Sequence, residues 1–404
     1  MDRARFLVGA FSITPALYAD EKIREVIGFG ADFIVSANAD PGLLALCERY
    51  GLELLASGRV PFWWGGDGEN AGQYAASHKP EDLAGILAEK PASPCIVGDY
   101  IVDEPNSRDF RAINAYLAAY RQACPGKLAY VNLYPNYASI PKNTDAECIS
   151  QLGNASYLEH IQQYVREVDT DYICFDYYPF TGRVYRTYLE NLDIVARACR
   201  ESGRDMWVIT QAGAWKAEEQ IAEFQVRWQA YLCMAYGARS VTHACYCPAW
   251  WEPTTSCVDK EGNRNPMYGW AKRVNEELHA LGDVYMRYRS IGVYTTGEST
   301  DEETQLQLEA QNGRNGSFRG FADVSISADG GLTIGCFKGE NGRAVMLVNC
   351  RDPRHAAAST EATLSVKPGT KFTVYRHGLP QTAAADGKLR LALASGEGLF
   401  VVFG

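Results

Sequence analysis

The sequence has 404 residues, of which 47% are apolar and 22% charged, as in an ordinary globular protein with room for one large domain and a smaller one. Its formal charge of −10 argues against nucleic acid or an anionic membrane as the main partner. No segment is long enough for a transmembrane helix, and no small-residue cleavage site follows the apolar run at 6–13. We therefore expect a cytoplasmic protein, although a signal peptide removed beforehand would leave no trace here. A homo-oligomer is compatible with these features.

Strand-like and helix-like patterns alternate eight times before residue 290. A helix begins in the expected way at Asp40-Pro41, with Asp as N-cap and Pro in the first turn, and Gly51 ends it. Strands separated by whole helices must be parallel, and eight such units have the size and rhythm of a TIM barrel. We therefore predict a (β/α)8 barrel over 1–289. The predicted strands are 6–13, 33–37, 53–57, 95–103, 128–134, 172–178, 206–211 and 240–246.

The pattern changes after about residue 290. The acidic segment 301–304 and the Asn- and Gly-rich segment 311–320 are typical of exposed loops. Short alternating runs separated by turns then predict an antiparallel β-sandwich of about six to eight strands over 290–404. The runs are 332–337, 344–349, 362–366, 372–375, 389–393 and 399–403.

The segment Cys95–Asn106 organises the predicted barrel. Its apolar, β-branched run stops at Asp103-Glu104, and Pro105 then prevents further strand pairing. This places two carboxylates at the C-terminal end of strand four, where barrels carry their chemistry. Adjacent strand residues point to opposite sides, so we assign the chemistry to Glu104 and a supporting role to Asp103.

Other polar side chains end the later strands. Asp176 lies within an apolar strand, where an ionised carboxylate is poorly tolerated unless it is paired or faces a site. Residues two apart on one strand share a side, so Asn132 with Tyr134, and Asp176 with Tyr178, can share the barrel mouth. His243 is equally well interpreted as a substrate contact or a core histidine. The remaining candidates at or just beyond strand ends are Gln211, Trp215 and Tyr246.

Aromatic residues are numerous, with 24 Tyr and 8 Trp. The pairs Trp63-Trp64 and Trp250-Trp251 lie in loops that would flank one barrel mouth, where they could pack structurally or serve as platforms for sugar rings. The spacing of Cys245 and Cys247, near His243, does not match a zinc knuckle. We therefore expect a carbohydrate partner and no metal or cofactor.

Several short motifs resemble the clan A glycoside hydrolases, and among them the bacterial barrels described as β-galactosidase-like or family-42-like. The resemblance implies a glycosidase whose general acid/base ends strand four, a position that Glu104 matches, while Asp103 stands where that clan usually has Asn. The clan's nucleophile is a Glu ending strand seven, but this chain has Gln211, which cannot attack an anomeric carbon. The motifs are G-D-Y-I-V-D-E-P at 98–105, N-L-Y-P-N-Y at 132–137, D-Y-Y-P-F at 176–180, T-Q-A at 210–212, W-Q-A-Y-L-C-M-A-Y-G-A at 228–238 and N-E-E-L at 275–278.

Three interpretations of the missing nucleophile stay open. Another carboxylate, with Asp176 best placed, acts as nucleophile or water-activating base; the substrate assists its own cleavage; or the barrel only binds glycans. Our leading hypothesis is a glycoside hydrolase with Glu104 as proton donor and Asp176 as its partner. The alternatives are a catalytically silent carbohydrate-binding barrel and a lyase or metal-dependent enzyme on the same fold. The predicted substrate-binding residues are Asp103, Asn132, Tyr134, Tyr178, Gln211, Trp215, His243, Tyr246, Trp63, Trp64, Trp250 and Trp251.

Overall fold

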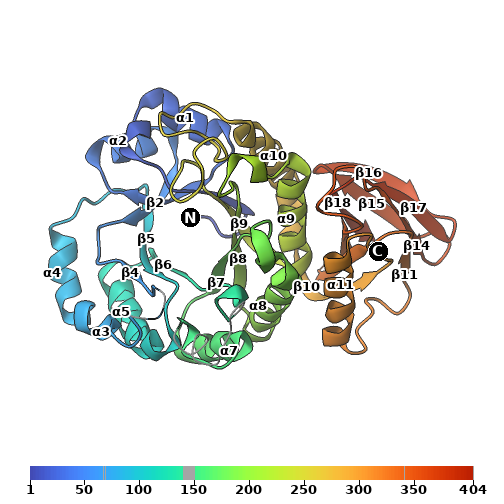
Figure 1. Ribbon diagram of the computed structural model, residues 1–404, viewed down its shortest axis with the longest axis horizontal. Coiled ribbons are helices and arrows are strands. Elements are labelled where there is room, and N and C mark those ends of the chain that lie inside the picture. The colour runs from blue at the N-terminus through green and yellow to red at the C-terminus, as the bar shows by residue number, and fades with distance from the viewer. Residues whose placement is uncertain (67, 69, 140–150, 341, 404) are drawn as a thin grey trace.

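A computed structural model describes residues 1–66, 68, 70–139, 151–340 and 342–403. Eight parallel strands form a ring in which neighbouring strands are hydrogen-bonded. The ring closes between β6 and β7 through a bridge between Leu133 and Phe175. Figure 1 looks into this ring, with helices around its outside. The predicted TIM barrel is confirmed. Its strands are β1 (Leu7–Phe11), β2 (Phe33–Asn38), β3 (Glu53–Ser57), β5 (Ile96–Asp103), β6 (Leu128–Asn132), β7 (Tyr172–Tyr177), β8 (Asp205–Gln211) and β9 (Ala238–Ala244).

The outer helices follow from local signals in the sequence. The Asp40 side chain accepts a hydrogen bond from the Gly42 N–H at 2.8 Å, and Gly51 ends that helix with φ 69°. None of the helices in the described ranges is long and apolar enough to cross a membrane. Within the described residues, the α-helices up to the end of the barrel are α1 (Asp20–Gly28), α2 (Pro41–Tyr50), α3 (Tyr74–Ser77), α4 (Leu83–Ala88), α5 (Phe110–Ala123), α7 (Tyr157–Glu167), α8 (Tyr188–Ser202), α9 (Glu223–Tyr236) and α10 (Pro266–Tyr285).

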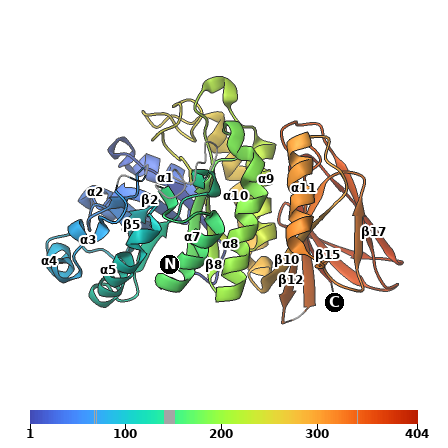
Figure 2. The same ribbon diagram turned by 60° about the horizontal axis from the view of Figure 1, so that its bottom comes forward.

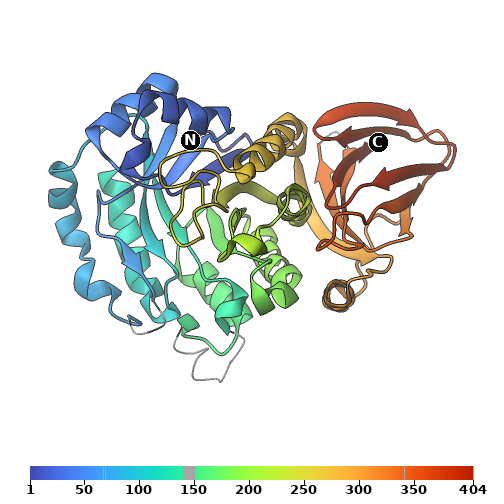
Figure 3. The same ribbon diagram turned by 45° about the horizontal axis from the view of Figure 1, so that its top comes forward.

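The C-terminal part is built from two antiparallel sheets, as predicted, and Figure 3 shows them beside the barrel. All six predicted runs lie on strands, and the described residues contain three more, β10, β11 and β16. The larger sheet has the order β10-β12-β13-β18-β15-β16 and the smaller has β11-β14-β17. The strands are β10 (Tyr288–Thr296), β11 (Ser325–Ala328), β12 (Leu332–Gly339), β13 (Gly342–Asn349), β14 (Thr360–Ser365), β15 (Lys371–Arg376), β16 (Leu379–Ala384), β17 (Lys388–Leu393) and β18 (Gly398–Phe403).

Helix α11 (Glu302–Asn315) occupies much of the region predicted to be loop, so that prediction is wrong. Asp301 caps the helix by accepting a hydrogen bond from the Thr304 N–H at 2.8 Å. Gln311 is fully buried. Its side-chain amide accepts a hydrogen bond from the Tyr236 hydroxyl and donates one to Asp193, and both partners lie on barrel helices. Figure 2 shows α11 standing between those helices and the C-terminal strands. Tertiary contacts therefore outweigh the loop-like composition.

Aromatic side chains fill the interior of the barrel. Tyr130, Tyr172 and Trp207 are buried there, and the rings of Tyr172 and Trp207 stack with their centroids 4.8 Å apart. Leu7 and Phe33 belong to the same buried cluster. The barrel is thus a packed core rather than a channel, and open space is left at its ends.

Candidate active site at the barrel mouth

A cavity of about 460 Å³ lies at the C-terminal ends of the barrel strands. Three carboxylates and one amide line it together with seven aromatic rings. The position is the one at which TIM barrels carry their sites. The lining residues are Phe11, Trp64, Tyr100, Asp103, Glu104, Asn132, Tyr137, Asp176, Tyr178, Ile209, Trp215 and Trp250.

Asp103 and Glu104 both line this cavity, although we expected adjacent strand residues to point apart. The strand β5 ends at Asp103, and Glu104 takes a left-handed backbone with φ 48°, which breaks the alternation. A left-handed non-glycine residue is strained, and such strain collects at functional sites. A close backbone approach accompanies the turn: a Cβ on Gly65 would lie 1.7 Å from the Glu104 carbonyl oxygen, so only glycine fits there.

Strand β4 (Trp63–Trp64) brings an aromatic ring to Glu104. Trp64 pairs with Asp103 in register, and its ring N–H donates to Glu104 Oε2 at 3.1 Å. The Trp64 side chain is 48% exposed, so this contact lies at the rim of the cavity. Glu104 therefore faces the opening.

Asn132 links the other two carboxylates. Its Nδ2 donates to Asp103 Oδ1 at 3.0 Å and to Asp176 Oδ1 at 2.8 Å, so one amide group holds two acids as neighbours. Asn132 and Asp176 are almost completely buried. Asp103 and Asp176 thus form the inner part of the site.

Burial raises the pKa of both inner carboxyls. For Asp103, hydrogen bonds from Asn132 and Tyr100 offset part of the rise in pKa. For Asp176, the nearby charge of Asp103 raises the pKa further, whereas the Asn132 amide lowers it. Two carboxyls this close resist ionising together, so the pair favours holding one proton.

The walls of the cavity are aromatic at two depths. Trp64 and Trp215 are exposed at the rim, whereas Phe11 and Tyr100 are buried deeper. Phe11 packs edge-on against Trp250 with ring centroids 5.6 Å apart. Such a mixture of ring faces and a few polar groups is typical of a pocket for sugar rings.

Two predicted polar residues, Tyr134 and Gln211, are buried outside the cavity lining of the described chain. Tyr134 donates its hydroxyl hydrogen to the Gly66 carbonyl. The Gln211 amide is occupied at both ends by backbone: its oxygen accepts from the Phe180 N–H and its nitrogen donates to the Gly213 carbonyl, each at 2.9 Å. Both residues therefore brace the loops that surround the mouth.

His243 faces the helix layer. Its Nε2 lies 2.7 Å from Asn275 Oδ1 on α10, and its ring packs against Phe29. Burial lowers the pKa of His243 to about 4, so the ring is neutral at physiological pH. The core interpretation of this histidine is the one that its surroundings favour.

Three predicted aromatic residues support the mouth from outside the cavity lining. Tyr246 packs on Phe29 with ring centroids 5.2 Å apart, and Trp63 packs on Tyr74 at 5.5 Å. Trp251 donates its ring N–H to the Ala244 carbonyl at 3.0 Å and packs against three lining rings.

Four lining residues were absent from the predicted set. Phe11 ends the first strand and Ile209 lies inside β8, where apolar residues resemble any core position. Tyr100 precedes Asp103 on β5, and Tyr137 follows β6 as the last residue of the N-L-Y-P-N-Y motif. A search of every strand end for aromatic residues, in addition to polar ones, would have found Phe11.

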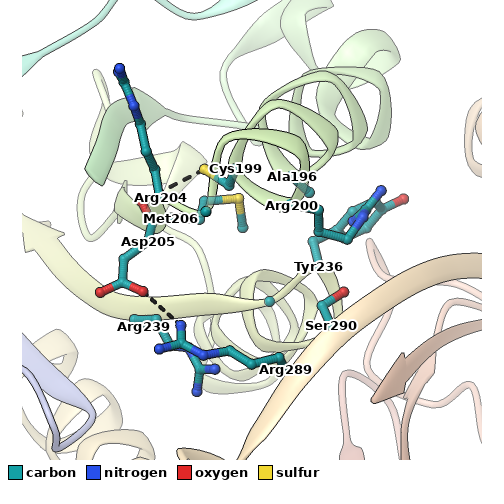
Figure 4. A pocket seen from close by; sticks show the side chains of 12 residues that line it. Ala196, Cys199, Arg200, Arg204, Asp205, Met206, Tyr236, Arg239, Arg289 and Ser290 are labelled. Atoms are coloured by element: carbon teal, nitrogen blue, oxygen red, sulfur yellow. Dashed lines mark hydrogen bonds and ion pairs between the residues drawn. The ribbon is translucent and has the colours of Figure 1, made fainter. Parts of the chain in front are cut away.

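A second cavity of about 360 Å³ lies at the opposite, N-terminal end of the barrel (Figure 4). Two of its arginines are bound to structural partners: Arg239 donates to the Tyr288 carbonyl at 2.5 Å, and Arg289 to Asp205 at 2.8 Å. The Nη1 of a third, Arg200, is buried without a hydrogen-bond partner among the described residues. Within the described residues, no group of three or more His, Cys, Asp or Glu side chains could hold a metal ion. The mouth cavity is therefore the candidate active site.

No family model and no curated protein matches this sequence. Among solved structures, the chain is similar to an intracellular xylanase from Thermoanaerobacterium saccharolyticum, with 11% identity, a TM-score of 0.43, and coverage of 66% of this chain and 95% of that one. A GH128 endo-β-1,3-glucanase from Pseudomonas viridiflava has 14% identity, a TM-score of 0.38, and coverage of 67% and 97%. A maltogenic α-amylase from Thermotoga neapolitana has 8% identity, a TM-score of 0.44, and coverage of 100% and 99%. Similarity this low leaves the activity to be argued from the site.

Proposed function

We propose that the protein is a glycoside hydrolase whose active site is the cavity at the barrel mouth. The supporting observation is the set of three carboxylates, Asp103, Glu104 and Asp176, beneath a rim of aromatic rings. Cleavage of an O-glycosidic bond needs a carboxyl group to protonate the leaving oxygen and ionised groups that stabilise the cationic sugar ring.

Glu104 is the proton donor in this proposal. It lies near the opening, held by Trp64, where the leaving group of a bound sugar would emerge. The inner pair, Asp103 and Asp176, then lies beneath the sugar ring, with Asp176 as the candidate for activating water or attacking the anomeric carbon. The family-42-like resemblance agrees with the role of Glu104.

The substrate is a neutral sugar. Among the described residues that line the cavity there is no Lys or Arg, so a phosphate or carboxylate on the ring would meet only the like charge of the acids. Trp64 and Trp215, exposed at the rim, would stack on the apolar face of a ring or its aglycone.

The test is a panel of aryl glycosides and neutral oligosaccharides assayed with the wild type and with Glu104→Gln. For any substrate that is cleaved, we expect the variant to lose about 10²–10⁴-fold in kcat, because the proton donor is removed. An unchanged melting temperature would show that the fold is kept. Glu89→Gln, which changes an exposed glutamate away from the cavity, serves as the matched control.

Undiminished hydrolysis by Glu104→Gln would overturn the role of Glu104. Glycan binding measured by calorimetry without any product would instead favour a carbohydrate-binding barrel, the alternative to which Gln211 at the end of β8 points. Chelator-sensitive activity would favour a metal-dependent enzyme.

A further inference from the structure

Asp103 has a position that a hydrolase with two separate acids does not need, because it lies next to the proposed proton donor. Asp103 directly precedes the proton donor Glu104 in the chain, and both line the same cavity because Glu104 is left-handed. The Asp103 carboxyl therefore shares the cavity with the carboxyl of the adjacent Glu104, which protonates the leaving oxygen. A substituent next to the anomeric carbon would come within its reach.

The wall at β8 adds no acid to this set. The Gln211 amide is bound at both ends to backbone, and β8 contributes the apolar Ile209 to the lining. Asp103 and Asp176 share one amide of Asn132 and repel each other when both are ionised. A pair that holds one proton is a weaker nucleophile than a lone ionised carboxylate, whereas each carboxyl keeps lone pairs that can accept a further hydrogen bond.

Asp103 accepts hydrogen bonds from Asn132 and Tyr100 and still keeps lone pairs for a further donor. The same cavity is lined by the apolar side chains Phe11, Ile209 and Trp250, which belong to one cluster. This combination suits a ligand with a secondary amide and a methyl group. The amide N–H would donate to the carboxyl group, and the methyl group would pack on the apolar wall. In a sugar, the acetamido group on carbon 2 supplies this combination next to the anomeric carbon.

We propose that the site hydrolyses glycosides of neutral 2-acetamido sugars, with the acetamido oxygen of the substrate as nucleophile, Glu104 as proton donor and Asp103 as acceptor for the acetamido N–H. This inference rests on the proposed glycosidase function. In this reaction the acetamido oxygen replaces Asp176 as the attacking group. Asn132 acts as a positioning residue, because its amide donates to Asp103 and Asp176.

The reaction balances without a further reactant except water. The acetamido oxygen bonds to the anomeric carbon as the glycosidic bond breaks, and the leaving oxygen takes the Glu104 proton. The positive charge that develops on the acetamido group is stabilised by Asp103 through the N–H bond. Water then adds to the anomeric carbon and gives its proton to Glu104. The bond from the acetamido oxygen breaks, and the sugar is released with its configuration retained.

The experiment compares aryl glycosides of 2-acetamido-2-deoxy hexoses with the parent aryl hexosides, and follows the first-formed anomer by NMR. A second series replaces the acetamido methyl hydrogens by one, two and three fluorines. We expect kcat of the wild type to fall by about a hundredfold across this series, because fluorine withdraws electrons from the attacking oxygen. This readout needs no variant and is unaffected by a merely structural role of Asp103.

Asp103→Asn is the matching variant, with Asp82→Asn, at an exposed position, as the control. We expect Asp103→Asn to lose about 10²–10³-fold in kcat/KM on the 2-acetamido substrates, because it no longer stabilises the developing charge. Cleavage of parent hexosides alone, or a flat fluorine series, would overturn this inference and leave the proposed glycosidase intact. If no glycoside of either kind is cleaved, the proposed function itself fails.

Discussion

The two ends of the barrel differ in the charges that they bring together. At the N-terminal end, opposite charges and dipoles meet: the exposed Arg289 binds Asp205 (Figure 4), and the buried Arg239 donates to the Tyr288 carbonyl. At the mouth, the acids Asp103 and Asp176 both accept a hydrogen bond from the side-chain amide of Asn132. The first arrangement satisfies polar groups that folding has buried. The second keeps like charges close, at a cost to stability that the fold alone does not require.

This contrast separates structural from functional polar groups without reference to any relative. Compensated charges should matter for stability and little for turnover, and crowded carboxylates should matter for turnover while stability improves when they are neutralised. The following variants test the contrast.

Among variants that keep all three carboxylates, the largest effect on turnover is expected for Asn132→Leu. Without its amide, Asp103 and Asp176 lose the hydrogen bonds that lower the pKa of both groups. We expect kcat/KM to fall about a hundredfold and its acid limb to move to higher pH, because the pair must still release a proton. A pH–rate profile measures both quantities. An unshifted profile would show that the pair does not govern the reaction.

The opposite end of the barrel should show the reverse pattern with Arg239→Met. The change leaves the Tyr288 carbonyl without its charged donor in a buried position. We expect the free energy of unfolding to fall by about 2 kcal/mol and kcat/KM to stay unchanged. Denaturant unfolding and a standard assay measure the two effects. A drop in turnover larger than the loss of folded protein would contradict the division between the two ends.

A smaller effect should appear in the pH dependence of stability. The pKa of Asp176 is raised, chiefly by burial, so the folded protein holds this proton more tightly than the unfolded chain does. Stability is then fully present below the unfolded-state pKa and falls as pH rises through the folded-state pKa. Asp176→Asn should remove this fall, which is on the order of 1 kcal/mol. Melting temperatures measured between about pH 4 and about pH 8 test this. Parallel curves for the two proteins would contradict it.

The barrel could be predicted because each strand and helix has its own local signal, as at Asp40 and Gly51. Helix α11 could not, because contacts such as those of Gln311 override its loop-like composition. Within the site, the strand ends identified Asp103, Glu104 and Asp176. A strand that is buried on both faces has no alternating pattern, so the sequence does not reveal toward which face a residue points. His243 is an example. Nor does the sequence reveal the left-handed turn at Glu104, which depends on a distant glycine.

The smallest effect concerns the rim and compares two exposed tryptophans. Trp64 donates its ring N–H to Glu104, whereas Trp215 packs edge-on against Trp251 with ring centroids 4.8 Å apart. Replacing either ring by Phe removes a similar stacking surface, but only Trp64→Phe also removes a hydrogen bond to the proton donor. We expect Trp64→Phe to lower kcat/KM about fivefold more than Trp215→Phe, which corresponds to about 1 kcal/mol for one hydrogen bond. Steady-state kinetics on the best substrate give the ratio directly. Equal losses would mean that the rim contributes to binding by stacking alone, and that Glu104 is oriented by its left-handed backbone without help from the indole.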